Sequence, residues 1–336
     1  MRILLATDAW TPQVNGVVIT LGRTVDELRS AGHDVEVIGP DRFRTVPCPS
    51  YPEIRLAIAP LRHFASLAGA FVPDTVHVAT EGPVGQAARR WCLSRGLAFT
   101  TAYHTRFPEY VHARLRLPVA ITYAWLRRFH APASAVMVAT RSIHDDLRGR
   151  GFGNLAMWSR GVDTELFRPG PRLANGWRTP VYMYVGRVAV EKNLDAFLRL
   201  DLPGTKVVVG DGPQRAELQA RYPDAVFTGA RHGAALADHF RSADVFVFPS
   251  RTDTFGLVLL EAMASGTPVA AFPVPGPLDV VLPGRSGVLD ADLRSAALAA
   301  QSLDRGVVRS CALEYSWQRA TAQFLHNLRP NRASAV

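Results

Sequence analysis

Short apolar runs alternate with amphipathic stretches along the first half of the chain. The runs typical of buried strands are Ile3–Ala6, Val35–Gly39, Val76–Val78, Ala98–Thr101 and Val136–Ala139. Helical patterns lie between several of them, notably over residues 19–31 and 85–95. This alternation predicts a parallel sheet with helices on both faces.

The same alternation resumes after residue 180. Its apolar runs are Val181–Val185, Val207–Val209, Ala225–Phe227, Val245–Phe248 and Val269–Phe272. Between the two series, residues 161–171 carry turn residues at both ends and no sustained periodicity, which indicates a joint. We therefore predict an α/β protein of two successive doubly wound, Rossmann-like domains. Ligands of such sheets bind beyond the carboxyl ends of the strands.

One of these strand ends carries candidate chemistry. After the run 245–248, a break precedes a helical pattern that begins near Phe255 and stops at Gly266. Gly256 lets backbone approach a ligand at the helix start, where free N–H groups and the dipole favour an anion. Asp253 lies in the loop, and Glu261 lies in an apolar stretch where an unpartnered charge is costly. Ligand hydroxyls would satisfy Glu261; alternatively it pairs with a structural Arg and Asp253 caps the helix.

Length and composition fit a globular protein of about two domains, with 336 residues, 48% hydrophobic and 20% charged. The opening apolar run is too short for a signal peptide and predicts a first strand. No apolar segment is long enough to cross a bilayer. Three cysteines without metal or redox spacing fit free thiols in a reducing cytoplasm.

The net charge of +9 is uneven, because residues 1–175 hold 21 Arg against 14 acids. A basic first half suggests attraction to anionic lipid or another acidic partner. The alternative is a general Arg bias without any partner. Nucleic acid is disfavoured, since no recognised module or aromatic-basic platform is present.

Two motifs in the second half resemble those of one enzyme family. VGRVAVEKN places Gly186, Arg187 and Lys192 after a predicted strand, and Lys192 is one of only two lysines in the chain. This segment closely resembles the G-R-x-x-x-x-K-N motif of retaining GT-B glycosyltransferases of family 4. The spacing from Asp253 to Glu261 resembles the acidic-x7-Glu signature of the same family.

The resemblance implies a role for each of these residues. Arg187 and Lys192 would bind the donor diphosphate, Glu261 would bind the ribose, and Asp253 would lie against the donor sugar. Asp253 stands where the family usually has Glu, so its reach is one methylene shorter. The other donor-binding positions implied by the resemblance are Gly16, Gly186, Thr228, Gly229, Phe255, Gly256, Leu257 and Val258.

The first half carries a further candidate in YHTRFPEY. His104 follows a predicted strand, and a lone His is usually structural. The segment matches the family's HT-x-F-P, which implies that His104 contacts the transferred sugar near the reacting carbon. The stretch 111–130 interleaves basic and apolar residues, which suits either a lipid interface or a core-facing helix with solvated Arg. The candidate acceptor residues are Glu81, Arg106, Arg127 and Arg128, although Glu81 alone fits a plain helix entrance.

Taken together, the resemblance implies a GT-B glycosyltransferase with domains at 1–165 and 166–315 facing each other across a cleft. Residues 316–336 would form a helix that crosses back to the first domain. His104, Asp253, Arg187 and Lys192 would be the catalytic group. Asp290 and Asp292 form a D-x-D pair that we interpret as solvated or capping residues, not as a metal site.

We expect a hexosyl or uronosyl group to pass from a UDP-sugar to a lipid such as diacylglycerol, without metal or cofactor. The alternative is a GDP-mannose-dependent alpha-mannosyltransferase that acts on a lipid or glycan acceptor. A non-catalytic sugar-nucleotide binder is the alternative of another class. The expected place of action is the cytoplasm, at the anionic inner face of the plasma membrane. An NAD enzyme is disfavoured because no G-x-G-x-x-G fingerprint is present.

Overall fold

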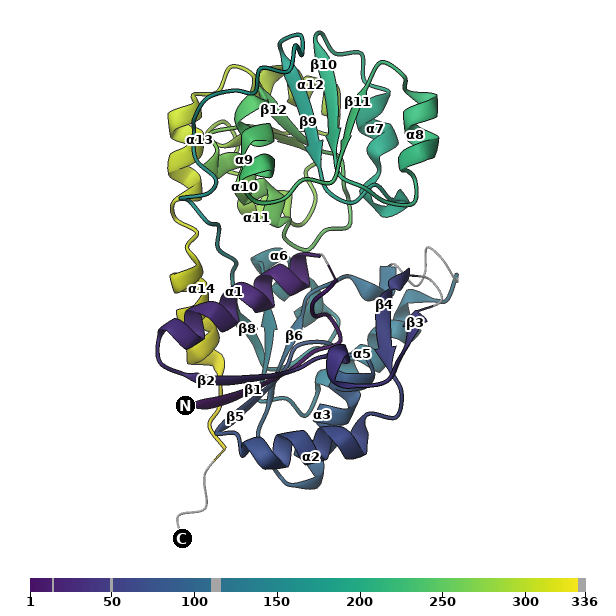
Figure 1. The fold of residues 1–336 in the computed structure, drawn as a ribbon, viewed down its shortest axis with the longest axis vertical. Helices are drawn as coiled ribbons and strands as arrows, with labels where there is room; N and C mark the ends of the chain where they lie inside the picture. Colours follow the sequence, from purple (N-terminus) through teal and green to yellow (C-terminus); the bar gives the residue numbers. More distant parts are fainter. Residues whose placement is uncertain (14, 49–50, 110–115, 332–336) are drawn as a thin grey trace. The chain divides into compact units, whose positions relative to one another are not determined.

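The computed structural model describes residues 1–13, 15–48, 51–109 and 116–331, and the chain divides into two compact units (Figure 1). Unit 1 comprises residues 1–159 and the C-terminal segment from Trp317. Unit 2 comprises residues 160–316. The first boundary thus lies six residues before the 165/166 position expected from the sequence.

Unit 1 is built on a six-stranded parallel sheet in the order β2-β1-β5-β6-β7-β8. Its strands are β1 (Arg2–Ala6), β2 (Asp34–Ile38), β5 (Thr75–Val78), β6 (Thr100–Tyr103), β7 (Ala135–Val138) and β8 (Leu155–Met157). An antiparallel hairpin, β3 (Thr45–Cys48) and β4 (Tyr51–Ala57), stands outside this sheet. The predicted strands are present; the hairpin and the short edge strand β8 are additional.

Helices cover both faces of this sheet. They are α1 (Gly16–Ser30), α2 (Leu61–Phe71), α3 (Pro83–Ser94), α5 (Val119–His130), α6 (Arg141–Gly149) and α14 (Trp317–Asn327). Side chains of α1 and α14 share one core cluster with Ile3 and Leu5. Side chains of α2, α3 and α5 share the opposite cluster with Leu4 and Ala6. Figure 1 shows α1 and α14 side by side, joined by a hydrogen bond from Gln318 to Glu27.

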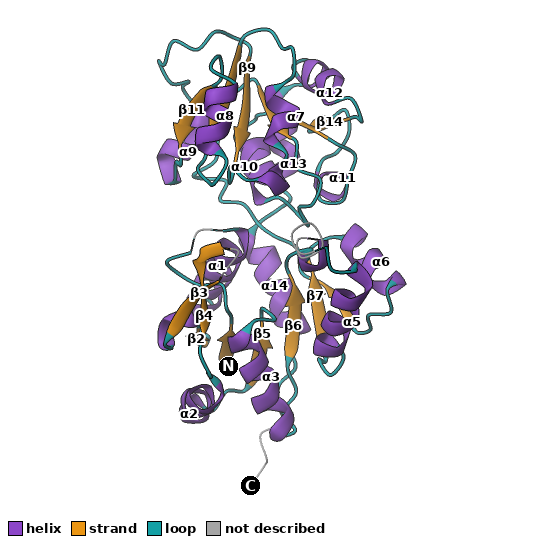
Figure 2. Cartoon of the chain, turned by 90° about the vertical axis from the view of Figure 1, so that its right-hand side faces the viewer, coloured by secondary structure: helices purple, strands orange, loops and turns teal. Residues whose placement is uncertain are grey.

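Unit 2 repeats the architecture with the order β11-β10-β9-β12-β13-β14, all parallel. Figure 2 shows β9 between β11 and β14. Its strands are β9 (Val181–Val185), β10 (Thr205–Val209), β11 (Val226–Gly229), β12 (Val245–Phe248), β13 (Val269–Ala271) and β14 (Gly287–Leu289). Its helices are α7 (Leu194–Leu198), α8 (Arg215–Arg221), α9 (Gly233–Ser242), α10 (Leu257–Ala264), α11 (Pro277–Val280), α12 (Leu293–Ala300) and α13 (Arg305–Ala312). Strand β12 is buried throughout, as its continuous apolar run predicts.

The segment predicted as a joint is held to unit 2 by two arginines. Arg309 Nη1 donates to the Phe167 carbonyl at 3.1 Å, and Arg241 Nε donates to the Arg168 carbonyl at 2.9 Å. Because these carbonyls lie outside any helix or sheet, the guanidinium groups replace the missing backbone partners. The segment is therefore ordered although it has no regular structure.

Candidate active site

The strand order of unit 2 marks one position for a ligand. Strand β9 lies in the middle, with β10 and β11 on one side and β12 to β14 on the other. The order therefore reverses between β9 and β12, and ligands of open α/β sheets bind outside the carboxyl ends of the strands at such a switch point. The loops that follow these two strands carry most of the donor residues predicted from the sequence.

An ion pair joins these two loops. Lys192 Nζ lies 2.5 Å from Asp253 Oδ1, and the two side chains are 20% and 17% exposed. Asn193 Nδ2 also donates to the Pro249 carbonyl at 3.1 Å. The structure therefore brings together a cation and a carboxylate that lie 61 residues apart in the sequence.

Asp253 has a second oxygen that forms no hydrogen bond with any described residue. Its Oδ2 is buried and has no hydrogen-bond partner within residues 1–13, 15–48, 51–109 and 116–331. A buried carboxylate oxygen without a donor is costly, and a hydroxyl group of a ligand would satisfy it. The alternative that Asp253 caps the helix is not what the structure shows, since the N-cap of α10 is Gly256.

The beginning of α10 has no side-chain cap. Gly256 has φ +81°, a conformation that favours glycine, and as the N-cap residue it has no side chain to bond to the first amides of the helix. These N–H groups and the helix dipole offer a place for an anion. Within α10, Leu257, Val258 and Glu261 are the residues that are not fully buried, and their spacing puts them on one side of the helix.

The loop after β9 positions Arg187. The buried Tyr184 hydroxyl donates to the Arg187 carbonyl at 2.9 Å. A Cβ on Gly186 would lie 2.7 Å from that hydroxyl, so this close approach requires glycine. Thr228 and Gly229 lie at the end of β11, two strands away from β9.

In unit 1, Gly16 is the first residue of α1. The Asn15 side chain accepts from the amides of Val17 and Val18, both at 3.0 Å. Asn15 therefore already satisfies two of the N–H groups at the start of this helix, next to the predicted donor-binding residue Gly16. Sequence reasoning gave Asn15 no role, although Asn is a preferred N-cap residue.

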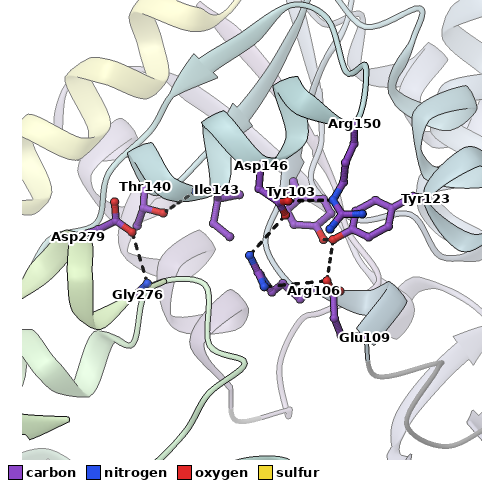
Figure 3. Close-up of polar contacts among 10 residues, drawn as sticks. All are labelled: Tyr103, Arg106, Glu109, Tyr123, Thr140, Ile143, Asp146, Arg150, Gly276 and Asp279. Atoms are coloured by element: carbon purple, nitrogen blue, oxygen red, sulfur yellow. Dashed lines mark hydrogen bonds and ion pairs between the residues drawn. The ribbon is translucent and has the colours of Figure 1, made fainter. Parts of the chain in front are cut away.

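His104 directly follows β6 and is half-buried, with its ring 5.6 Å from that of Trp158. The segment after it is fixed by a polar network (Figure 3). Arg106 lies 3.4 Å from Asp146 of α6, and the Tyr123 hydroxyl of α5 donates to Glu109 at 2.8 Å. The segment that carries His104 is thus tied to two helices.

Two further members complete this network. The Tyr103 hydroxyl lies 3.5 Å from that of Tyr123, and the Arg150 guanidinium lies 4.0 Å from the centre of the Tyr123 ring. Burial raises the pKa of Tyr123 to about 12. Sequence reasoning missed these residues; the i,i+4 spacing of Asp146 and Arg150 was the only local signal for them.

Two of the three remaining acceptor candidates, Glu81 and Arg127, have structural partners. Glu81 lies 3.2 Å from the buried His130. Arg127 Nη1 donates to the Arg150 carbonyl at 3.2 Å, which ties α5 to the end of α6. Arg128 is exposed. Residues 110–115, the beginning of the predicted interfacial stretch, lie outside the described residues.

The D-x-D pair is a capping element. Asp292 is the N-cap of α12 and accepts from the Arg294 amide at 3.0 Å, while Asp290 accepts from the Asp292 amide at 2.8 Å. Within the part of the chain that the structure describes, no group of three His, Cys, Asp or Glu side chains is arranged to hold a metal ion.

Asp8, at the carboxyl end of β1, is a buried carboxylate that sequence reasoning did not single out. It accepts from the Thr80 hydroxyl at 2.8 Å and from the Val84 and Gly85 amides at 2.8 and 3.2 Å. It therefore caps α3 from a neighbouring strand. Burial raises the pKa of Asp8 above 3.8, against the lowering effect of these hydrogen bonds.

This raised pKa predicts a pH dependence of stability. The native state holds the Asp8 proton more tightly than the unfolded state, so Asp8 lowers the free energy of unfolding as the pH rises from 3.8 through its native pKa. Asp8→Asn should remove this decline, as measured by urea unfolding from pH 4 to 8. The exposed Asp34→Asn should retain it. An identical pH profile for wild type and Asp8→Asn would contradict the prediction.

The fold and the site define a two-unit α/β enzyme of the glycosyltransferase type, and the comparisons with known proteins agree. Residues 14–166 match the family described as Glycosyltransferase Family 4, and residues 179–304 match that described as Glycosyl transferases group 1. The chain belongs to these glycosyltransferases. The predicted family, the GT-B fold and the class of hexosyltransferase are confirmed.

Individual relatives and structures are similar over most of the chain. A GDP-mannose-dependent alpha-mannosyltransferase of Mycobacterium tuberculosis is 33% identical, covering 86% of this chain and 83% of the relative. An alpha-monoglucosyldiacylglycerol synthase of Streptococcus pneumoniae is 25% identical, covering 81% and 71%. Sucrose-phosphate synthase from Thermosynechococcus elongatus has the same fold, with a TM-score of 0.78 at 20% identity and 97% of each chain covered.

Proposed function

We propose that this protein transfers a hexosyl group, with retention of configuration and without a metal ion, from a nucleotide diphosphate sugar to a lipid acceptor. The observation that carries this proposal is the Lys192–Asp253 pair at the switch point, beside the uncapped start of α10. A cation, free amides and a carboxylate oxygen in need of a donor together suit a diphosphate joined to a sugar.

The charges suggest how the site would work. As the bond from the sugar to phosphate breaks, negative charge grows on the leaving diphosphate. Lys192, Arg187 and the first amides of α10 would stabilise that charge, and electrostatic stabilisation of this kind usually contributes most to lowering the barrier. Asp253 Oδ2 would accept from a hydroxyl of the donor sugar, and the family resemblance gives His104 a contact with the transferred sugar.

The comparisons bear on the donor. The mannosyltransferase relative is GDP-mannose-dependent, which supports GDP-mannose over the UDP-sugars that we favoured from the sequence. The relative that makes monoglucosyldiacylglycerol supports a lipid acceptor. We therefore put GDP-mannose first and UDP-glucose, UDP-galactose and UDP-glucuronate second, with diacylglycerol as the model acceptor.

One face of unit 1 supports a membrane partner. Helices α2, α3 and α5 carry Arg62, Arg89, Arg90, Arg127 and Arg128 but no Asp or Glu, and we call this the acid-free face. On α5, Ile121 is 62% exposed and Trp125 is 44% exposed, one turn apart and in line with Arg128. Exposed apolar side chains among cations suit the boundary of an anionic bilayer. Among the described residues, no helix is long and apolar enough to span a membrane.

Transfer can be tested with labelled donors. Purified protein is incubated with vesicles that contain diacylglycerol and with each radiolabelled donor, and the lipid extract is counted. We expect label in the lipid from GDP-mannose, with α-linkage in the product. Label in no lipid from any donor would remove the acceptor proposal, and an inverted linkage would remove the retaining mechanism.

The membrane partner leads to a separate prediction. Trp125→Ser/Arg128→Glu should weaken sedimentation with phosphatidylglycerol vesicles by at least about tenfold, since each cation near such a surface contributes about 1 kcal/mol. Leu282→Ser/Arg285→Glu, which changes an exposed apolar residue and an exposed Arg of unit 2, is the matched control. Equal sedimentation of the two variants would refute this docking face.

A further inference from the structure

Glycine backbone links the carboxyl ends of β9, β10 and β11. Gly186, Gly210, Gly212 and Gly229 lie there, all with positive φ, and we call them the glycine shelf. The Gly186 amide donates to the Val209 carbonyl, and the Gly210 amide donates to the Gly229 carbonyl, both at 3.0 Å. A Cβ on Gly210 would lie 1.8 Å from the Gly186 carbonyl oxygen. The three strand ends are thus joined without room for a side chain between them.

The shelf runs from the switch point to the edge of the sheet. Neighbouring strands are about 4.8 Å apart, so the ends of β9 and β11 are separated by roughly 10 Å. This distance is comparable with the length of a nucleoside. A nucleoside whose diphosphate meets Lys192 would therefore extend along the shelf.

Arg215 stands at the far end of the shelf. Its Nη1 donates to Asp211 Oδ2 at 2.9 Å, and Asp211 Oδ1 accepts from the Gly212 amide at 2.8 Å. The Nη1, Nη2 and Cζ atoms lie 3.4, 3.6 and 3.7 Å from the position of a Cβ on Gly229. These similar distances place the face of the guanidinium group against the Gly229 turn. Arg215 is therefore held in one orientation, while its side chain remains 32% exposed.

We propose that Arg215 selects the donor base by hydrogen bonding to the O6 and N7 atoms of guanine. This inference rests on the proposed function, because it places the donor nucleoside on the shelf. Guanine presents two adjacent acceptors that match the planar guanidinium fork. Adenine presents an amino group in place of O6, and a uracil edge offers a single carbonyl oxygen. An arginine fixed by Asp211 loses little side-chain entropy on binding such an edge.

The test compares nucleotides that differ in these acceptor atoms. Dissociation constants of GDP, IDP, 7-deaza-GDP, ADP and UDP are measured by calorimetry. Wild type should bind GDP and IDP alike, since both present O6 and N7, and should bind 7-deaza-GDP more weakly because it lacks N7. This comparison needs no variant and is independent of any effect of substitution on folding.

Variants then identify the residue. Arg215→Ala should weaken GDP binding by about 10- to 100-fold and leave ADP and UDP unchanged. Arg215→Lys should not restore GDP binding, because a lysine keeps the charge but lacks the fork. Arg221→Ala is the matched control, since Arg221 lies on the same helix and pairs with Glu217 and Asp195.

The possible outcomes separate this inference from the proposed function. Equal losses for GDP, ADP and UDP in Arg215→Ala, or the same selective loss in Arg221→Ala, would overturn the role of Arg215. Preferred binding of UDP that Arg215→Ala does not alter would also overturn it, while the transferase proposal would stand. Failure of wild type to bind any of the five nucleotides would instead overturn the proposed function.

Discussion

Lys192→Ala is expected to lower the rate of sugar transfer by about 100- to 1000-fold, the usual effect of removing one group that stabilises a developing negative charge. In the structure, Lys192 forms an ion pair with the Asp253 carboxylate and so links the loops after β9 and β12. Its loss removes positive charge at the site where the diphosphate would leave. The measurement is the initial rate of transfer at saturating donor.

The same substitution also lowers stability, which must be separated from the effect on catalysis. Without Lys192, the Asp253 carboxylate is left without its ion pair at a cost of about 1–3 kcal/mol. Lys192→Ala/Asp253→Asn should recover stability, because it removes both charges, but it should not recover transfer.

Lys206→Ala is the control, since Lys206 is the chain's other lysine and its Nζ donates to the Leu200 carbonyl at 2.9 Å. A Lys192→Ala rate within tenfold of wild type would show that this cation does not stabilise the leaving group.

Gly210→Ala is expected to cost about 3 kcal/mol of stability or more and to weaken donor binding by over tenfold. Gly210 has φ +154°, and its Cβ would overlap the Gly186 carbonyl oxygen. Positive φ is itself unfavourable for alanine, and the overlap would force the loops after β9 and β10 apart. Because Arg187 follows Gly186 directly, the change would also displace a predicted diphosphate ligand.

Gly204→Ala provides a control at the opposite end of β10. Gly204 has φ +85°, and its Cβ would lie 2.1 Å from the Pro180 carbonyl oxygen. We expect a similar loss of stability, measured by urea unfolding, but unchanged donor affinity in the folded fraction. Equal weakening of donor binding in both variants would show that the shelf has no special part in binding.

The sequence predicted the parallel sheets well because their central strands are buried on both faces. The run Val245–Phe248 is entirely apolar and could be recognised by itself. The edge strands Leu155–Met157 and Gly287–Leu289 have three residues each, too few to show a pattern. The hairpin at Thr45–Ala57 contains prolines, which weaken a strand signal.

The sequence identified residues of the candidate site but did not predict which of them contact each other. Motif spacing singled out Lys192 and Asp253, yet nothing in it predicts that they pair across two loops. Tyr123 and Glu109 meet only because helix α5 packs beside the end of β6. The sequence does not predict a partner for Asp8, because the start of α3 reaches it only in the folded unit. Partners far apart in the sequence depend on tertiary packing, which local patterns do not contain.

The acid-free face also determines how the protein behaves in dilute buffer. The whole protein has a net charge of +9 and should therefore adsorb at low ionic strength to any polyanion, including nucleic acid and heparin. Electrostatic attraction extends about 30 Å at 0.01 M salt but only about 8 Å at 0.15 M. Retention on a heparin column that is lost near physiological salt would therefore reflect charge alone. Insertion of Trp125 and Ile121 into lipid vesicles, in contrast, would persist at that salt concentration.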